Sequence, residues 1–388
     1  MSGFSNQRMK SNTNPVPVSL AAPRAQGHGT SAYRLPYLDW VRGFGALIML
    51  QGHVFDSFLR PELRPGGAYV LSQFVGGMPP AIFLFLTGVT LSFLMDSSER
   101  KGMAPRDRVV TAFRRSGYLF GLAFAFRVQL FIFGFPAAWQ DLFRVDILNC
   151  MGFSIALLSA LAFFHTRQRV AICAAVGLAI ALASPLVSAL NWSQVPWLIR
   201  NYIVPSKLFF GFFPWGAYLA FGMSAGSLIR STRRDAIARV MQWVALAGGA
   251  TIIACQYLAH VSFSIYRQSD FWLDSPAQVL TKQGVTWVML AFAFLWTRYG
   301  AGEGWSLVRQ FGTTSLLVYW VHIELVYGRS FWFLKNALTV GQTMVSGVFV
   351  ILVMLALSTA RTNWPAVSQW LAEWGWWYGT RPERVPAD

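Results

Sequence analysis

The sequence predicts an all-α protein, a polytopic bundle of about ten transmembrane helices. Its composition, its long apolar stretches and the placement of its positive charge support this fold class. Of the 388 residues, 55% are hydrophobic and only 12% are charged, whereas soluble domains carry about 25% charged residues. A helix needs about 20 apolar residues to cross the hydrocarbon core of a bilayer. Ten stretches of suitable length are present: 37–58, 68–95, 109–133, 146–164, 170–190, 208–229, 240–260, 279–297, 307–327 and 338–360.

The second stretch contains two adjacent prolines, Pro79 and Pro80. A proline inside a helix removes a backbone hydrogen bond and clashes with the preceding turn. We therefore expect this helix to break at the prolines and to cross the membrane from Ala81 onward. A helix that is interrupted at membrane depth must line protein or water rather than lipid.

Lysine and arginine are distributed unevenly between the two sides of such a bundle. If the N-terminus is cytoplasmic, 21 of the 32 basic residues lie on the cytoplasmic side, 8 lie on the opposite side and 3 lie within spans. Cytoplasmic connections normally carry the excess of positive charge, so both termini are predicted to be cytoplasmic. The same pattern explains the net charge of +16. It favours the lipid bilayer as partner and argues against a nucleic acid.

The predicted membrane domain covers residues 35–361. Residues 1–34 are polar, lack the apolar core of a signal peptide, and are predicted to form a disordered cytoplasmic tail. Residues 362–388 are predicted to form an aromatic segment along the membrane interface, followed by a cytoplasmic tail. The three cysteines are far apart and lack metal-ligand spacing, so no metal site is predicted.

Polar side chains from five predicted spans fall at one level near the extracytoplasmic face. Such groups are costly in lipid and usually face a cavity or one another. They are His53, Asp56, Arg127, Gln129, Asp146, Asn149, Lys282, Gln283, Tyr319, His322 and Glu324. Snorkelling to water is the simpler explanation for Gln129, Asn149 or Lys282 alone, and Asp146 can equally cap its helix. For His53 and His322 a function is favoured, because imidazole transfers protons near neutral pH.

The first predicted span carries polar groups at both ends. Arg42 and His53 are eleven residues apart, which is about 16 Å along a helix and close to a whole number of turns. Both side chains therefore project from one face, which could line a path across the membrane. Asp39 lies three residues before Arg42 and Asp56 three residues after His53, each within side-chain reach. Asp39 and Arg42 form either a structural ion pair or a binding site for an anionic donor, and Asp56 is predicted to orient the His53 imidazole.

These residues also carry a family resemblance. The segment Leu38-Asp39-Trp40-Val41-Arg42-Gly43, followed by Met49 and by His53-Val54-x-Asp56-x-Phe58, resembles the opening signature of bacterial membrane proteins related to heparan-alpha-glucosaminide N-acetyltransferase. An arginine and a histidine separated by ten residues are also typical of a sister family, the multispanning acyltransferases that O-acetylate surface polysaccharides. Residues 79–88 (PPAIFLFLTG) resemble the second apolar span of the first family, and 311–322 (FGTTSLLVYWVH) is similar to an ending shared by both.

The resemblance implies an acyltransferase of the bacterial inner membrane. It moves an acyl group, often acetyl from cytoplasmic acetyl-CoA, to a hydroxyl or amine of a sugar-like carbohydrate or glycolipid acceptor on the far side. No permanently bound cofactor is implied. In the mammalian enzyme of the family the catalytic histidine falls in the loop after the first span, where this sequence has none, so the acceptor does not carry over.

On this hypothesis His53 is the general base or, alternatively, the acylated intermediate, oriented by Asp56, and His322 is a second acid/base or binds the acceptor. Arg42, with Asp39, holds the donor together with Arg114 and Arg115. The acceptor-binding groups are Arg127, Tyr319 and Glu324. The alternative is a proton-coupled transporter that uses the same intramembrane His, Asp and Glu side chains as a proton relay.

Overall fold

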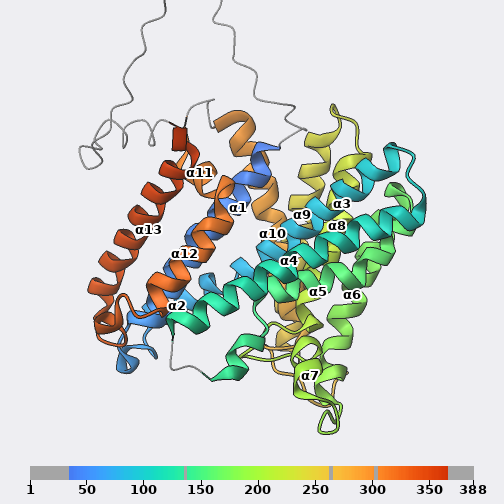
Figure 1. The fold of residues 1–388 in the computed structure, drawn as a ribbon. Coiled ribbons are helices and arrows are strands. Elements are labelled where there is room, and N and C mark those ends of the chain that lie inside the picture. Colours follow the sequence, from blue (N-terminus) through green and yellow to red (C-terminus); the bar gives the residue numbers. More distant parts are fainter. Residues whose placement is uncertain (1–34, 135–137, 262–264, 301–304, 366–388) are drawn as a thin grey trace, which may run out of the picture. The chain divides into compact units, whose positions relative to one another are not determined.

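Helices account for all the regular secondary structure in the computed structural model of the protein (Figure 1), which describes residues 35–134, 138–261, 265–300 and 305–365. The all-α prediction is therefore confirmed. The α-helices are α1 (Pro36–Phe58), α2 (Gly67–Gly76), α3 (Pro79–Arg100), α4 (Pro105–Phe133), α5 (Ile147–Leu158), α6 (Thr166–Ala189), α7 (Trp197–Ile203), α8 (Phe212–Ser231), α9 (Ile237–His260), α10 (Pro276–Leu295), α11 (Leu307–Thr313), α12 (Ser315–Tyr327) and α13 (Val340–Thr362). Five short helical turns are η1 (Pro61–Leu63), η2 (Trp139–Phe143), η3 (Ser159–Phe163), η4 (Trp296–Gly300) and η5 (Trp332–Leu334). The predicted tail 1–34 and residues 366–388 of the predicted aromatic segment and tail lie outside the described residues.

Six helical stretches within the described ranges are long and apolar enough to cross a membrane, as judged by length and composition. They are Gly67–Arg100, Pro105–Phe133, Thr166–Ala189, Ile237–His260, Pro276–Gly300 and Val340–Thr362. The other four predicted spans coincide with helices that are shorter or less apolar, namely α1, α5 with η3, α8, and α11 with α12. The chain is an integral membrane protein, whereas ten spans and two cytoplasmic termini stay predictions.

The predicted interruption of the second span is present. Helix α2 ends at Gly76 and α3 begins at Pro79. At this break α2 lies against α1, because a Cβ atom on Gly52 would come within 2.9 Å of the Gly76 Cα atom. The side chain of Gln73 also donates a hydrogen bond to the Gly52 carbonyl oxygen. The start of α3 is thus held next to the C-terminal half of α1.

The prediction of one continuous helix over 307–327 is wrong. Thr314, with φ of −121° and ψ of 18°, separates α11 from α12. Before this break α11 lies directly against α1: a Cβ atom on Gly312 would overlap the Asp39 carbonyl oxygen, and one on Gly43 would overlap the Val308 carbonyl oxygen. The Thr314 hydroxyl is also hydrogen-bonded to that of Ser358 in α13.

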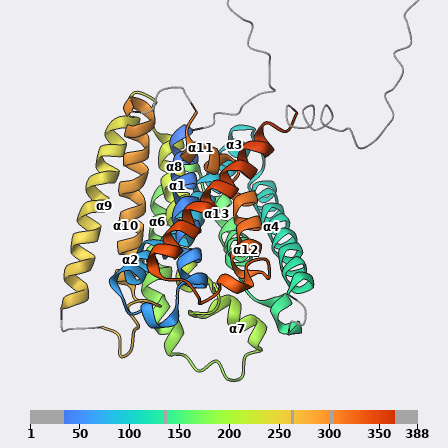
Figure 2. The same ribbon diagram turned by 90° about the vertical axis from the view of Figure 1, so that its left-hand side faces the viewer.

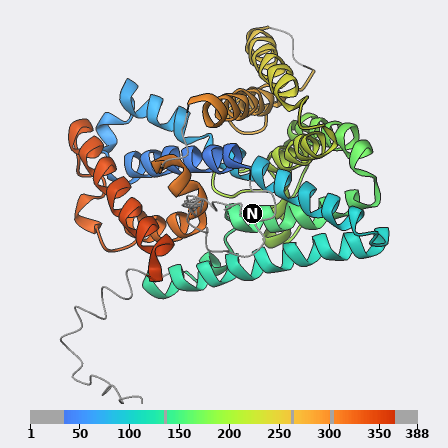
Figure 3. The ribbon, with the colours of Figure 1, turned by 90° about the horizontal axis from the view of Figure 1, so that it is seen from above.

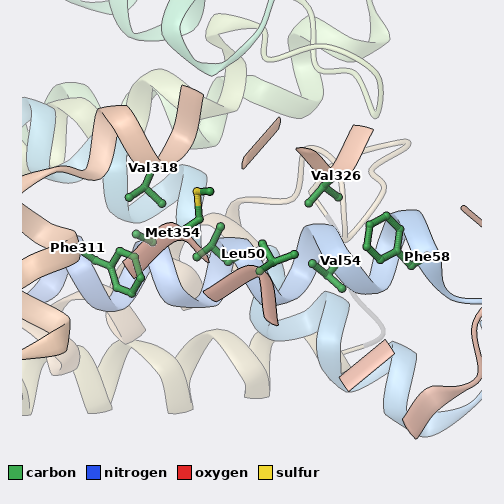
Figure 4. Close-up of a cluster of buried hydrophobic side chains, with 9 residues drawn as sticks. Leu50, Val54, Phe58, Phe311, Val318, Val326 and Met354 are labelled. Atoms are coloured by element: carbon green, nitrogen blue, oxygen red, sulfur yellow. The ribbon is translucent and has the colours of Figure 1, made fainter. Parts of the chain in front are cut away.

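Two groups of closely packed helices form much of the bundle, one containing α3 and α8 and the other containing α1 (Figures 2 and 3). In the first group α3 packs on α8 with the backbones in contact, because a Cβ atom on Gly88 would overlap the Leu219 carbonyl oxygen and one on Gly222 that of Phe85. Small residues allow this close packing of membrane helices. In the second group α1 packs against α11, α12 and α13 through a buried apolar cluster (Figure 4). The labelled members of that cluster are Leu50, Val54, Phe58, Phe311, Val318, Val326 and Met354.

Candidate functional site

A cavity of about 720 Å³ lies between α1, the start of α3, the end of α4, the segment that leads into α5, and α12. Its polar lining residues are His53, Arg127, Asp141, Arg144, Asp146, Tyr319, Glu324 and Tyr327. Its apolar lining includes Met49, Pro79, Pro80, Phe83 and Phe126. Five residues that the sequence analysis placed in one outer cluster therefore line one cavity. We call this space the His53 cavity.

The two histidines predicted to be functional contact each other. His53 of α1 and His322 of α12 are joined by a hydrogen bond of 2.9 Å between His53 Nδ1 and His322 Nε2. The rings lie 5.1 Å apart between centroids and are inclined by only 17°. His53 lines the cavity, whereas His322 has an exposed fraction of zero and does not line it. Two helices far apart in the sequence thus build one imidazole pair.

The predicted contact between Asp56 and His53 is absent from the hydrogen bonds of the described residues. The Asp56 carboxylate instead accepts one hydrogen bond from the Tyr327 hydroxyl, at 2.9 Å, and one from the Tyr69 hydroxyl, at 3.2 Å. The Tyr327 ring meets the His53 ring edge to face, with 5.4 Å between centroids. His322, not Asp56, is hydrogen-bonded to the His53 ring, and a role of Asp56 in orienting that ring, here through Tyr327, stays a prediction.

A second polar pair crosses the cavity wall from α4 to the start of α5. Arg127 Nε lies 3.2 Å from Asp146 Oδ2. The other carboxylate oxygen of Asp146 accepts the backbone N–H of Asn149 at 3.0 Å, so this residue also caps α5. Glu324 lines the same cavity, and its Oε2 atom is buried without a hydrogen-bond partner among the described residues. Polar groups that can bind a hydrophilic ligand are thus present beside His53.

Arg42 lies toward the other end of α1. It forms an ion pair with Asp39 at 3.0 Å, as the spacing predicts. The α1 residues that line the cavity are His53 and Met49, and the helix face between Met49 and Arg42 is packed, with Ala46 fully buried and Gly45 in contact with Ile82. The predicted path along this face is therefore closed in this structure over about 10 Å.

Other predicted residues lie apart from the cavity. Arg114 and Arg115 are exposed on α4, where Arg115 lies over the ring of Tyr118. No contact joins either of them to Arg42 among the described residues. Lys282 lies over the Trp215 ring, 5.5 Å from its centroid, and the neighbouring Gln283 is fully buried. Neither of these two side chains lines the cavity.

The two tyrosines that hold Asp56 are not among the site residues predicted from the sequence. Tyr327 follows Tyr319 and Ile323 at intervals of four residues, and all three line the cavity from one face of α12. That spacing is a helical signal that could have identified Tyr327. Tyr69 lies on the short helix α2, and nothing in its sequence neighbourhood marks it.

A second polar centre lies at the far end of α3, and we call it the ion-pair cluster. Asp96 and Glu99 of α3 meet Arg108 of α4, Arg169 of α6 and Arg230 of α8. Arg230 Nε lies 2.6 Å from Asp96, while Arg108 and Arg169 each lie 3.4 Å from Glu99. Asp96, Arg108 and Arg169 are buried. Sequence reasoning counted these arginines only as topology signals.

A comparison with known protein families identifies the chain. The family model for the catalytic domain of heparan-alpha-glucosaminide N-acetyltransferase matches residues 34–266, more than half of the sequence. The chain belongs to this family. No curated protein matches it significantly. Membership of the heparan-alpha-glucosaminide N-acetyltransferase family indicates a membrane acyltransferase, in agreement with the resemblance found in the sequence. The match includes His53, Asp56, Arg127 and Asp146, whereas His322 and Glu324 lie beyond it.

Proposed function

We propose that this protein transfers an acyl group, normally acetyl from acetyl-CoA, to a hydroxyl or amine of a carbohydrate or glycolipid bound in the His53 cavity. The observation that carries the proposal is the position of His53, an imidazole in the wall of a polar cavity that is hydrogen-bonded to a buried histidine. Family membership supports the acyltransferase chemistry. The cavity opens on the extracytoplasmic side in the orientation predicted from the charge distribution.

The reaction needs one base and no resident cofactor. His53 takes the proton of the acceptor hydroxyl or amine while the acceptor oxygen or nitrogen bonds to the thioester carbonyl carbon. The carbon–sulfur bond then breaks, and the CoA thiolate takes the proton back from the imidazolium. Atoms and charge balance, because the proton that leaves the acceptor ends on the thiol.

The polar groups around His53 provide acceptor recognition. Arg127 and Asp146 present a paired guanidinium and carboxylate, which together can donate to and accept from a polyhydroxylated ligand. Glu324 adds a carboxylate oxygen that has no partner among the described residues, and Tyr319 adds a phenol in the same wall. This combination suits an uncharged or amine-bearing sugar.

The donor reaches the site from the opposite end of α1. Arg42 is the cation at that end, and it lies in the same predicted span as His53, the proposed base. The packed stretch at Gly45 and Ala46 must separate from Ile82 before a thioester can reach His53 from that side. Arg114 and Arg115 have no part in this proposal, because both face outward on α4.

Replacement of His53 tests the proposed function. We expect the purified His53→Ala protein to lose acyl transfer from radiolabelled acetyl-CoA by about 10² to 10⁴-fold, the usual contribution of a general base. His260→Ala is a matched control, because His260 is exposed at the end of α9, and it should retain activity. Full activity of His53→Ala would refute the assignment. Mass spectrometry of envelope glycans and lipids from cells with and without the gene then identifies the acceptor. The acceptor is the molecule that loses the mass of one acyl group when the gene is absent.

A further inference from the structure

His322 is enclosed by protein. Its exposed fraction is zero, and it is not among the residues that line the His53 cavity. A side chain in that position does not touch an acceptor in the cavity. Within the described residues it meets two residues of the cavity wall: its ring is hydrogen-bonded to His53 and lies edge to face with Tyr319, at 5.9 Å between centroids. Its effect on the proposed base passes through the hydrogen bond to His53. The inference below rests on the proposed function of His53 as the base.

The hydrogen bonds of His322 determine which of its nitrogens carries hydrogen. His322 Nδ1 lies 2.7 Å from the carbonyl oxygen of Val318 in the preceding turn of α12. A carbonyl oxygen only accepts, so Nδ1 is the donor. In a neutral imidazole the second nitrogen is then bare, and His322 Nε2 is an acceptor. The assignment follows from the hydrogen-bond network.

The same reasoning extends to His53. Its Nδ1 lies 2.9 Å from the bare Nε2 of His322 and must be the donor in that bond. His53 Nε2 is consequently bare, and it belongs to the ring that lines the cavity. The opposite arrangement would place hydrogens on both nitrogens of His322. That arrangement puts a positive charge on a fully buried ring, and such burial is costly without a paired anion.

We propose that His322 is a positioning residue that holds His53 in the tautomer with hydrogen on Nδ1. The Nε2 atom of His53 is thereby kept free to take a proton from an acceptor in the cavity. When it does so, the imidazolium keeps its bond to His322 through Nδ1, but the partner is a neutral ring and not a carboxylate. His53 therefore returns the proton readily, which suits a base that must next protonate a thiolate.

Two substitutions separate the hydrogen bond from packing. His322→Phe fills the site with a ring of similar size but provides no acceptor. His322→Gln offers an amide oxygen that can accept the His53 Nδ1–H. We expect His322→Phe to lower kcat by about 10² to 10⁴-fold, with the KM of the acceptor changed less than threefold. The kcat of His322→Gln should be at least tenfold higher than that of His322→Phe. Both proteins should keep the wild-type melting temperature.

Nitrogen-15 NMR of the full-length protein, labelled at histidine and reconstituted in lipid, measures the tautomer directly. In the wild type we expect His53 to carry hydrogen on Nδ1 and a bare Nε2, with signals assigned by their loss in His53→Ala. This readout holds even if His322→Phe fails to fold. A wild-type His53 with hydrogen on Nε2 would overturn the inference, as would a folded His322→Phe protein with near-normal kcat.

The same measurements distinguish this inference from the proposed function. If His53→Ala is inactive while His322→Phe is active, the positioning role fails and the function of His53 stands. If His53→Ala remains active although the NMR spectrum shows the expected tautomer, the proposed function fails while the hydrogen-bond assignment stands.

Discussion

The His53 cavity and the ion-pair cluster are both polar centres inside an apolar bundle, but their charges are used differently. They lie toward opposite ends of α3, because Pro80 lines the cavity and Asp96 comes about 24 Å further along the helix. In the ion-pair cluster each carboxylate meets at least two cations. In the cavity, Glu324 Oε2 has no hydrogen-bond partner among the described residues. Arg108 and Arg169 of the ion-pair cluster also have buried nitrogens without a hydrogen-bond partner among the described residues, but Glu324 lines a cavity, where a ligand can contact it.

The comparison first predicts that the two centres lie on opposite sides of the membrane. Ser193 is exposed in the loop after α6, a helix whose first turn carries Arg169 of the ion-pair cluster, so this loop lies at the end away from that cluster. Lys101 is exposed directly after α3, next to Arg100, which pairs with Asp96. The cysteines Cys150, Cys173 and Cys255 are buried and give little background. In intact cells we expect an impermeant maleimide to label Ser193→Cys and not Lys101→Cys. Labelling of Lys101→Cys alone would reverse the proposed orientation.

The second prediction concerns the stability provided by the ion-pair cluster. Arg169 is fully buried and donates to the Phe164 carbonyl oxygen and the Thr166 hydroxyl, as well as meeting Glu99. Removing one partner of a buried pair costs about 3 to 5 kcal/mol. We therefore expect Arg169→Met to lower the free energy of unfolding in SDS titrations by about that amount.

Arg100→Met is the control for that substitution. Arg100 also pairs with a carboxylate, Asp96 at 2.9 Å, but its side chain is 62% exposed. An exposed pair contributes at most about 1 kcal/mol, so this variant should be nearly as stable as the wild type. Equal losses of unfolding free energy in the two variants would show that burial of an arginine does not determine how much its ion pair stabilises the protein.

The third and smallest effect is expected from Glu324→Gln in the His53 cavity. The substitution keeps the shape of the side chain and removes its charge. Because a hydrogen bond to a charged group is worth about 1.5 to 3 kcal/mol, the KM for the acceptor should rise about 10- to 100-fold, with the melting temperature unchanged. Glu62→Gln, at an exposed position in η1, is the control. Steady-state kinetics with an unchanged KM in Glu324→Gln would remove Glu324 from the acceptor site.

The sequence predicts well what depends on one helix alone. The break at Pro79 and Pro80 and the ion pair of Asp39 with Arg42 follow from local spacing, and both are present. The partner of Asp56 does not follow from spacing. The two tyrosines that donate to Asp56 come from α2 and from the end of α12, and they are 13 and 271 residues away in the sequence. Asp56 is hydrogen-bonded to their hydroxyl groups and not to His53, although the spacing of Asp56 and His53 on α1 would allow a contact.

Long-range packing also explains the other differences. Thr314 lies between a helix packed on α1 through Gly312 and Gly43 and a hydroxyl contact to Ser358 of α13, and no pattern within residues 307–327 reveals these partners. The arginines of the ion-pair cluster belong to three separate helices. Each one reads as an ordinary basic residue beside a span until the fold brings all three to the carboxylates of α3.

The closed stretch of α1 between Arg42 and Met49 has a consequence for the cell as well as for catalysis. A passage open from end to end would let protons and ions leak across the membrane and dissipate the gradients stored there. With Ala46 fully buried and Gly45 against Ile82, the His53 cavity is closed by apolar packing on the side of Arg42. A cavity closed in this way can admit a hydrophilic molecule from one end while the membrane stays electrically insulating.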